Sequence, residues 1–217
     1  MDGSRGYREC APPAKAAPAA DQILNLLNWR RRIADLYASV RAQVDPEQAW
    51  RLWRDGRAEL FGSHPQSPLP PSSRHRLPRY YDYDPAARTT GRVIAADGLE
   101  IQLPGSVEET FPAMRFGVVE FELRGARCQL DAFWLAGYAG GLFLPFRDAT
   151  AGTDTYGGGR YLLDTAKGAD LGGVSDQLVL DFNFSFQPSC SYDPRWSCPL
   201  SPPGSVLQLP VTAGERL

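Results

Sequence analysis

The chain has 217 residues, 43% of them hydrophobic, so it can bury the core of one good-sized domain. Its formal net charge of −2 excludes an overall basic field that would attract nucleic acid or an anionic membrane. No apolar run approaches the roughly 20 residues of a membrane helix, and the first residues lack the pattern of a secretory signal. We therefore expect a cytoplasmic protein with reduced cysteines, no nucleic-acid partner and no membrane contact.

The N-terminal part divides into a tail and a helical segment. Residues 1–19 are rich in alanine and proline and are predicted to be a disordered tail, because this composition cannot bury apolar surface. Residues 20–62 show apolar residues at helical spacing, which predicts two helices. Asp21 and Asp45 are the expected N-caps, and Pro46 occupies the first turn of the second helix, where proline is favoured.

Two features of the helical segment admit a functional interpretation. The triple arginine at 30–32 is interpreted as a solvated helix face, with one arginine paired to Asp21 or Asp35, in preference to a nucleic-acid contact. The apolar side of the second helix carries Trp50, Trp53 and Phe61, and such a stripe more often packs into a core than binds a ligand. The alternative is a non-enzymatic interaction module that docks a partner, or forms a homodimer, through this segment.

The rest of the chain is predicted to be an irregular linker followed by a β domain. The linker, residues 63–89, ends in the aromatic and acidic run 79–85, which is either an extended segment laid across the β domain or the rim of a pocket. Residues 90–217 show short apolar runs separated by frequent turns, which is typical of an antiparallel barrel or sandwich. The predicted fold class is therefore mainly β, with an N-terminal segment of two helices.

Two turns and one alternating pattern are specific enough to test. Asp97-Gly98 is the favoured dipeptide of a two-residue hairpin, and Gly125-Ala126 is a plausible type II′ turn. Around the second turn, apolar and charged residues alternate, so one face should be buried; the expected core residues are Val119, Phe121, Leu123, Cys128, Leu130 and Ala132. Further strands are predicted at 142–144, 161–163 and 178–184.

The first segment that could carry chemistry is the loop at 145–161, between two apolar strands. Arg147 and Arg160 could form a fork for a carboxylate or phosphate, and the glycine triplet at 157–159 permits close backbone approach. The loop is not a phosphate-binding P-loop, because it lacks the Lys-Ser/Thr end and a following helix. The other polar candidates in this loop are Asp148, Thr155 and Tyr156.

The second segment begins at Asp181 and Asn183, which are two apart on a predicted strand and should share a face. Cys190 and Cys198 follow at the ends of a seven-residue loop. Four interpretations stay open for them: structural thiols, a ligand or catalytic thiol activated by Arg195, a disulfide, or metal ligands. The chain has only two histidines, which argues against His-based zinc sites and Ser-His-Asp catalysis, and no metal site is predicted.

These segments suggest a protein that binds a small anionic molecule, with hydrolase-like activity as an extension. Arg147 and Arg160 would hold the anion, and Asp148 or Asp181 would be the candidate catalytic carboxylate. The remaining predicted ligand contacts are Thr155, Tyr156, Asn183, Cys190 and Cys198. The alternative is a structural network in which Arg147–Asp148 and Arg160–Asp181 pairs pin loops over the β domain. The sequence identifies no cofactor and does not decide whether the protein is an enzyme.

Several motifs in the C-terminal half closely resemble a prokaryotic family, domain of unknown function 1684. They are the runs at 146–150, 155–161, 181–183, 190–200 and 213–215. Two positions depart from the family pattern: Gln187 stands where the family usually has asparagine, and 202–207 lacks the usual glutamate and asparagine. The resemblance implies no established activity, so it supports the location of a site rather than a function.

Overall fold

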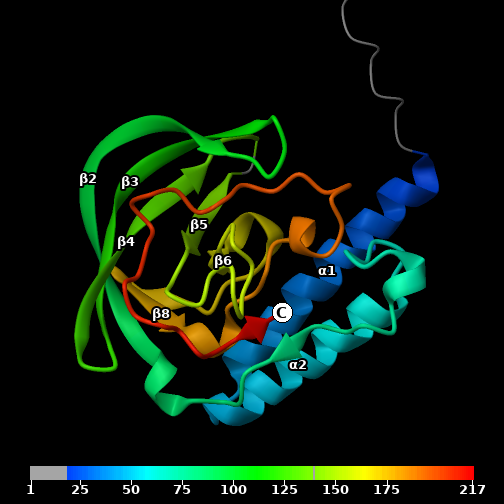
Figure 1. The fold of residues 1–217 in the computed structure, drawn as a ribbon, viewed down its shortest axis with the longest axis horizontal. Coiled ribbons are helices and arrows are strands. Elements are labelled where there is room, and N and C mark those ends of the chain that lie inside the picture. The colour runs from blue at the N-terminus through cyan, green and yellow to red at the C-terminus, as the bar shows by residue number, and fades with distance from the viewer. Residues whose placement is uncertain (1–18, 139) are drawn as a thin grey trace, which may run out of the picture.

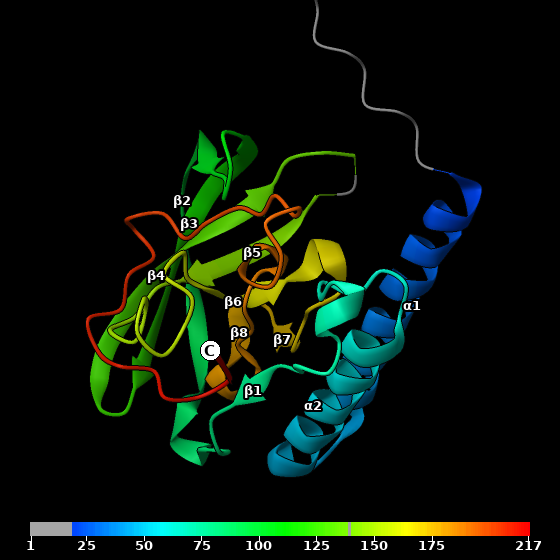
Figure 2. The same cartoon turned by 45° about the vertical axis from the view of Figure 1, so that its right-hand side comes forward.

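The computed structural model describes residues 19–138 and 140–217. The predicted disordered tail at 1–19 therefore lies outside the described residues, except for Ala19. Within the described part, a helical hairpin lies on one side of the molecule and a strongly curved sheet on the other (Figures 1 and 2). No helix in the described ranges has both the length and the apolar character needed to cross a membrane.

The two predicted helices are confirmed as α1 (Ala20–Ala42) and α2 (Pro46–Ser63). Asp45 caps α2, and its Oδ1 accepts a hydrogen bond from the backbone N–H of Glu47 at 2.9 Å. The predicted cap at Asp21 is wrong, because α1 begins at Ala20 and its N-cap is Ala19, which offers no capping side chain. Asp21 lies instead in the first turn, where its negative charge interacts favourably with the positive end of the helix dipole.

One arginine of the triple arginine on α1 forms an ion pair with α2 rather than with an acidic residue of α1. Arg32 pairs with Glu59 of α2 at 2.7 Å, not with Asp21 or Asp35. The side chains of Arg32 and Glu59 are 36% and 65% exposed, so water screens this pair and it adds little stability. It shows that the triple arginine belongs to the surface of the hairpin, as a solvated face would.

Two antiparallel sheets make up the β part. The larger is open, with the order β6-β5-β4-β3-β2-β8-β7, and the smaller pairs β1 with β9. The mainly β fold class is therefore confirmed, and the open sheet is sandwich-like rather than a closed barrel. The strands are β1 (Arg79–Tyr80), β2 (Arg88–Pro104), β3 (Thr110–Leu123), β4 (Ala126–Leu135), β5 (Gly141–Phe146), β6 (Arg160–Asp164), β7 (Gly173–Val174), β8 (Gln177–Asp181) and β9 (Glu215–Arg216).

The predicted hairpin at Asp97-Gly98 is wrong. β2 runs through this dipeptide without turning, and the register with β3 shifts between Ala95 and Leu99. A Cβ on Gly98 would lie 2.9 Å from the sulfur of Met114 on β3. The glycine therefore marks a bulge where two strands approach closely, which is the other common meaning of glycine inside a strand.

The second predicted turn is present but shifted by one residue. β3 ends at Leu123 and β4 begins at Ala126, so the turn residues are Arg124 and Gly125 rather than Gly125 and Ala126. Both have positive φ, 51° and 79°, which is the pattern of a type I′ turn rather than a type II′ turn. The alternation beside it is confirmed on β3, since Val119, Phe121 and Leu123 are buried while Glu120 and Glu122 are exposed. On β4, Leu130 and Ala132 are buried as expected, but Cys128 is only partly buried.

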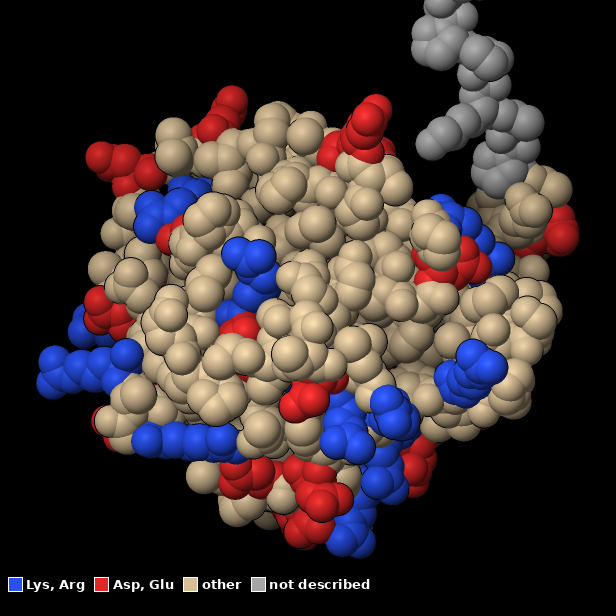
Figure 3. Space-filling view, in the orientation of Figure 1, with Lys and Arg blue, Asp and Glu red and all other residues tan. Residues whose placement is uncertain are grey.

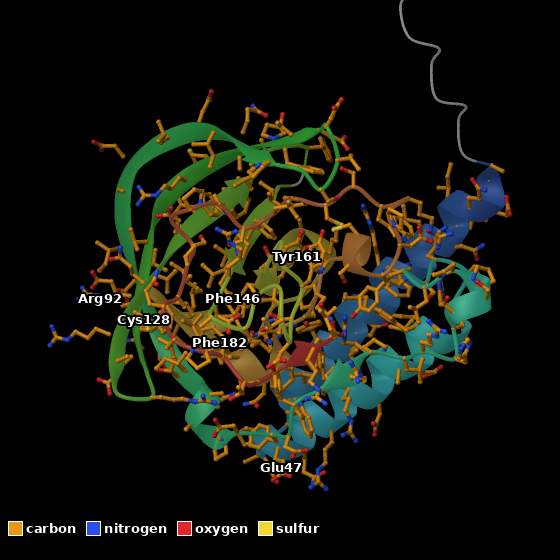
Figure 4. All side chains as sticks on the ribbon, viewed as in Figure 1. Glu47, Arg92, Cys128, Phe146, Tyr161 and Phe182 are labelled. Carbon is orange, nitrogen blue, oxygen red and sulfur yellow. The ribbon has the colours of Figure 1, made fainter. Side chains whose placement is uncertain are left out.

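The helical hairpin and the sheet share one hydrophobic core. Trp53 of α2 has no exposed surface, and its ring lies 5.3 Å from that of Phe184, centroid to centroid. Figure 4 shows Phe146, Tyr161 and Phe182 in the interior, whereas Glu47 and Arg92 lie at the periphery. Trp50 and Phe61 are buried as well, so the apolar side of α2 is occupied by the protein's own core and is not free to dock a partner.

The predicted linker and the end of the chain pass between these two parts. Residues 63–89 are not wholly irregular, because they contain β1 and two short 3₁₀ turns, Pro71–Ser73 and Pro85–Ala87. The run at 79–85 is extended where β1 pairs with β9, which agrees with its interpretation as an extended segment laid across the β domain. The C-terminal segment crosses the open side of the sheet before it reaches β9 (Figure 1).

Candidate ligand site between the helical hairpin and the sheet

The predicted site residues fall into three separate clusters, and the first surrounds Arg160. This side chain is 1% exposed, and its Nη1 donates to the carbonyl oxygens of Ala213 and Glu215, at 2.5 and 3.1 Å. Its Nη2 donates to Val211 O at 2.8 Å and to Asp148 Oδ1 at 3.4 Å. Both terminal nitrogens of Arg160 are thus used by the protein's own C-terminal segment.

Asp148 completes the same cluster. Its Oδ2 accepts from the backbone N–H of Val211 at 2.6 Å, and both its oxygens lie within 3.1 Å of the Thr150 hydroxyl. The hydroxyl of Thr155 lies 2.9 Å from that of Thr150. Arg147 stands apart, since its backbone N–H and C=O bond to Ser205 and Leu207. The geometry is that of a network holding the C-terminal segment on the sheet, and the predicted anion fork of Arg147 and Arg160 stays a prediction.

The second cluster joins Asp181 and Asn183, but not across a strand face. β8 ends at Asp181 and Phe182–Phe184 form a 3₁₀ turn, which corrects the strand predicted through residue 184. Asp181 Oδ1 accepts from the backbone and side-chain nitrogens of Asn183, at 3.1 and 2.9 Å. Asp181 Oδ2 accepts from Arg88 at 3.2 Å, so the expected pairs Arg147–Asp148 and Arg160–Asp181 are replaced by Arg160–Asp148 and Arg88–Asp181.

The hydrogen bonds of Asn183 indicate that this second cluster is also structural. Asn183 accepts from Asp84 N–H at 2.9 Å and donates to Asp84 O at 2.8 Å, and it thereby ties the start of β2 to the end of β8. Burial raises the pKa of the Asp181 carboxyl, while hydrogen bonds from Asn183 and Arg88 oppose that rise. These polar groups all form hydrogen bonds within the protein.

The third cluster contains the thiols. Cys190 and Cys198 are both unbridged in the described chain. The backbone N–H of Cys190 donates to Cys198 Sγ at 3.4 Å, and Cys190 Sγ lies 3.7 Å from the hydroxyl of Tyr156. A side-chain hydrogen bond with Cys198 lowers the pKa of Cys190 to about 6, against the opposing effect of burial.

Other groups around the thiols explain this environment. Ser106 contributes to lowering the Cys190 pKa, and its Oγ accepts from the backbone N–H of Cys198 at 3.1 Å. Arg195, the cation suggested by the sequence, pairs instead with Asp193 at 3.3 Å and donates to Ser67 O. Burial raises the pKa of Tyr156 to about 12, so its hydroxyl stays a proton donor at neutral pH.

Beside the thiols, two adjoining cavities of about 70 and 120 Å³ lie between the helical hairpin and the sheet. Trp29 of α1, Pro68, Lys167 and Ser189 line both of them. We call the pair the helix–sheet cavity. The smaller part reaches Arg57 and Asp164, and the larger part reaches Arg30 and Cys198. The cavity thus combines an apolar wall with a few charged groups and a thiol, as ligand sites commonly do.

Asp164 is the most unusual polar group in this cavity. Its Oδ2 lies 3.8 Å from Lys167 Nζ, while its Oδ1 is buried and has no hydrogen-bond partner among the described residues. Burial raises the pKa of this carboxyl, and the nearby Lys167 opposes the rise. A buried carboxylate oxygen without a donor is costly, so this atom is ready to accept a hydrogen bond from a bound molecule.

Arg57 contributes a buried guanidinium that is paired with Glu215. Its Nε and Nη2 both donate to Glu215 Oε1, at 2.9 and 2.5 Å. Glu215 also accepts from the Gln187 backbone N–H and the Tyr192 hydroxyl, each at 2.8 Å. This network fastens α2 to β9, and it places the positive charge of Arg57 at the wall of the smaller part of the cavity.

Sequence reasoning missed Trp29, Arg57, Asp164 and Lys167, because they come from distant segments and none belongs to a recognisable motif. One signal was available: the chain has only two lysines, Lys15 and Lys167, and every other basic side chain except histidine is arginine. On the face that Figure 3 shows, acidic and basic side chains are both present and intermingled.

Comparison with known proteins identifies the family. The chain belongs to the family described as Protein of unknown function (DUF1684), whose model matches residues 75–216. The structure is similar to the solution NMR structure of an uncharacterized protein of Haloarcula marismortui, with a TM-score of 0.60 and 34% sequence identity. That similarity covers 79% of this chain and 94% of the other. Among curated proteins, no match was found.

Proposed function

We propose that this protein binds a small anionic molecule, which also carries a hydroxyl or amino group, in the helix–sheet cavity. The observation that carries the proposal is the buried, unpartnered Oδ1 of Asp164 in the same cavity as Lys167 and Arg57. A cation beside an unpaired carboxylate is suited to a ligand with both an acceptor and a donor. The ligand's hydroxyl or amino group would donate to Asp164, and its anionic group would accept from the basic side chains.

Lys167 is the basic group best placed to receive the anion. Its side chain is 58% exposed and lines both parts of the cavity, so it stands where an incoming molecule would pass. The 3.8 Å between its Nζ and Asp164 is longer than an ordinary hydrogen bond, which leaves its donors free to turn toward a ligand. Arg57, which lines the smaller part of the cavity, would add a second positive charge near the anion.

The volume of the cavity limits the size of the ligand. Parts of about 70 and 120 Å³ are smaller than the roughly 300–1,000 Å³ of a site for drug-sized molecules. The apolar wall is formed in part by Trp29, Phe61 and Phe186. We infer a compact ligand, such as a short hydroxy acid or amino acid.

Binding has stronger support than hydrolase-like activity. A hydrolase built on Cys190 would need a base to activate water for release of the covalent intermediate, but the side chain that contacts its sulfur is the Tyr156 hydroxyl, which stays protonated at neutral pH. The ring nitrogens of His64 are engaged by Asn28 and by the Gln66 backbone, and His75 is exposed. The proposal is therefore limited to binding.

The test is a thermal-shift screen of the full chain against small carboxylates, hydroxy acids, amino acids and phosphate. A ligand present at 100 times its Kd stabilises the folded state by about 2.7 kcal/mol, which corresponds to a rise in Tm of about 5–10 °C for a chain of this size. For any hit, Lys167→Gln should weaken the affinity at least tenfold, since a charge-assisted hydrogen bond contributes about 1.5–3 kcal/mol.

A matched variant separates the site from a general charge effect. Arg51→Gln removes one positive charge from an exposed face of α2 that does not line the cavity, and it should leave the affinity unchanged. Equal affinities of the wild type and Lys167→Gln would reject the proposed site. The absence of any stabilising compound across these classes would reject the proposed ligand chemistry.

A second proposal is self-association through the helical segment, and one observation favours it. The first two turns of α1 expose four large aliphatic side chains: Ile23, Leu24, Leu26 and Leu27. Ile23, Leu26 and Leu27 have the spacing of one helix face. A homodimer that covers this face would use different residues from the tryptophans of α2, which the core already buries.

A further inference from the structure

The loop between Cys190 and Cys198 brings two sulfur atoms together without joining them. Cys190 lies in the 3₁₀ turn Ser189–Ser191, and the chain returns so that Cys198 Sγ accepts from the Cys190 backbone N–H at 3.4 Å. A sulfur atom this close to the backbone of the other cysteine is compatible with the Cα separation of roughly 4.4–6.8 Å that a disulfide requires. The folded chain therefore holds the two cysteines side by side.

The two thiols differ in the way that a reactive pair should. Cys190 is half-buried, so a small reagent can reach it, while Cys198 is 3% exposed. Hydrogen bonds lower the pKa of Cys190 to about 6, and the same interaction raises the pKa of Cys198. At neutral pH, Cys190 is therefore mostly a thiolate nucleophile and Cys198 a protonated partner.

The hydrogen bonds at these positions do not require sulfur. Cys198 Sγ accepts from one backbone N–H and Cys190 Sγ contacts the Tyr156 hydroxyl, and a serine oxygen could take both roles. No cluster of three or more metal-binding side chains exists within residues 19–138 and 140–217. Redox chemistry is a property that a pair of thiols has and a pair of hydroxyls lacks.

We propose that Cys190 and Cys198 form a redox-active dithiol that hydrogen peroxide converts to an intramolecular disulfide. In the first step, the Cys190 thiolate attacks one peroxide oxygen; an S–O bond forms, the O–O bond breaks, and the leaving hydroxide takes a proton to become water. In the second step, Cys198 sulfur attacks Cys190 sulfur; the S–S bond forms, the S–O bond breaks, and hydroxide leaves with the Cys198 proton as water. Two thiols are oxidised by two electrons, and one peroxide is reduced to two waters.

The proposal does not depend on the ligand, although the two sites adjoin. Cys198 lines the larger part of the helix–sheet cavity, so disulfide formation would alter one wall of it. The experiment for the thiols therefore reads sulfur chemistry alone, and its failure would leave the proposed ligand untouched.

The test uses the full chain with Cys10 and Cys128 replaced by serine, so that only the pair remains. The reduced protein is treated with one equivalent of hydrogen peroxide, free thiols are blocked with N-ethylmaleimide, and intact mass and peptide mapping follow. The expected product is a monomer with no maleimide, a Cys190–Cys198 cross-link and full return of two thiols after dithiothreitol. Two blocked thiols after peroxide, or a disulfide between chains, would overturn the proposal.

Single variants assign the order of attack. Cys198→Ser should stop at a sulfenic acid on Cys190 that dimedone traps, while Cys190→Ser should leave Cys198 unoxidised under the same conditions. Iodoacetamide should alkylate Cys190 with a midpoint near pH 6, and at pH 6 about tenfold faster than an ordinary cysteine thiol. Cys128 in the unmodified chain is the internal comparison, because burial raises its pKa. A Cys190 that reacts no faster than Cys128 at pH 6 would remove Cys190 as the attacking thiol.

Discussion

Replacement of Arg57 by methionine should lower the free energy of unfolding by about 3–5 kcal/mol, because it leaves the buried carboxylate of Glu215 without its cationic partner. The side chains of Arg57 and Glu215 are 6% and 0% exposed, and two of the guanidinium nitrogens bond to one carboxylate oxygen. The guanidinium carbon lies 4.8–5.1 Å from the ring centroids of Trp53, Phe61 and Phe186, so methionine loses these cation–π contacts but leaves an apolar group among the rings. Most of the loss would come from Glu215, left with neutral donors from Gln187, Tyr192 and Tyr80.

The assay is urea unfolding followed by tryptophan fluorescence, since Trp53 lies at the seam between α2 and the sheet. A loss of 3–5 kcal/mol lowers Tm by roughly 6–20 °C in a chain of this length. It should still leave the variant folded if the parent has a typical stability of about 5–15 kcal/mol. Adding Glu215→Gln to Arg57→Met should return part of the loss, giving a coupling energy of about 0.5–3 kcal/mol.

Arg51→Met is the matched control on the same helix. Arg51 pairs with Glu47 at 2.6 Å, but both side chains are about half exposed, so the same substitution should cost less than about 1 kcal/mol. The reasoning would be refuted if Arg57→Met cost no more than Arg51→Met. It would also be refuted if the two losses at 57 and 215 simply added, since a shared buried pair cannot behave as two independent sites.

Two further predictions concern the acidic range and the surface of α1. Because burial raises the folded-state pKa of Asp164 above its unfolded value, the folded state binds the proton more tightly, and stability falls as pH rises through that window. The wild type should therefore gain stability relative to Asp164→Asn as urea unfolding is repeated from pH 7 down to pH 4; a difference independent of pH would contradict this. Sedimentation velocity should show a concentration-dependent dimer that Ile23→Gln/Leu27→Gln dissociates, and a monomer at every concentration would reject self-association through α1.

Local periodicity predicted the elements well because it depends on neighbours in sequence. The alternation from Val119 to Ala132 has a period of two, so the buried face could be read directly, and Asp45 with Pro46 marked the start of α2. The errors at Asp97-Gly98 and Gly125-Ala126 have one cause. A glycine marks special backbone geometry, but whether that geometry is a turn or a bulge depends on the partner strand.

The site was harder to predict because its hydrogen-bonded pairs join segments that are far apart in the sequence. Arg160 and Asp148 are close in sequence, yet both are satisfied by residues 211–215, which no local pattern connects to them. Cys190 and Cys198 were recognised as a pair because a short loop limits their separation. The groups that lower the Cys190 pKa, Ser106 and Tyr156 among them, come from other parts of the fold and could not be foreseen.

The family motifs can be divided by what their polar groups do in the fold. Arg160, Asp148, Asn183 and Glu215 are all buried, and their hydrogen bonds hold the C-terminal segment, the end of β8 and α2 in place, so their presence is explained by folding. The pairing of Glu215 with Arg57 also makes the helical hairpin, which lies outside the matched residues 75–216, an integral part of this structure. Cys190 differs from these residues, because the hydrogen bond of its sulfur, with the Tyr156 hydroxyl, is one that serine could also make. Chemistry at that position should therefore be sought before chemistry at the arginines, although the arginines attract more attention in the sequence.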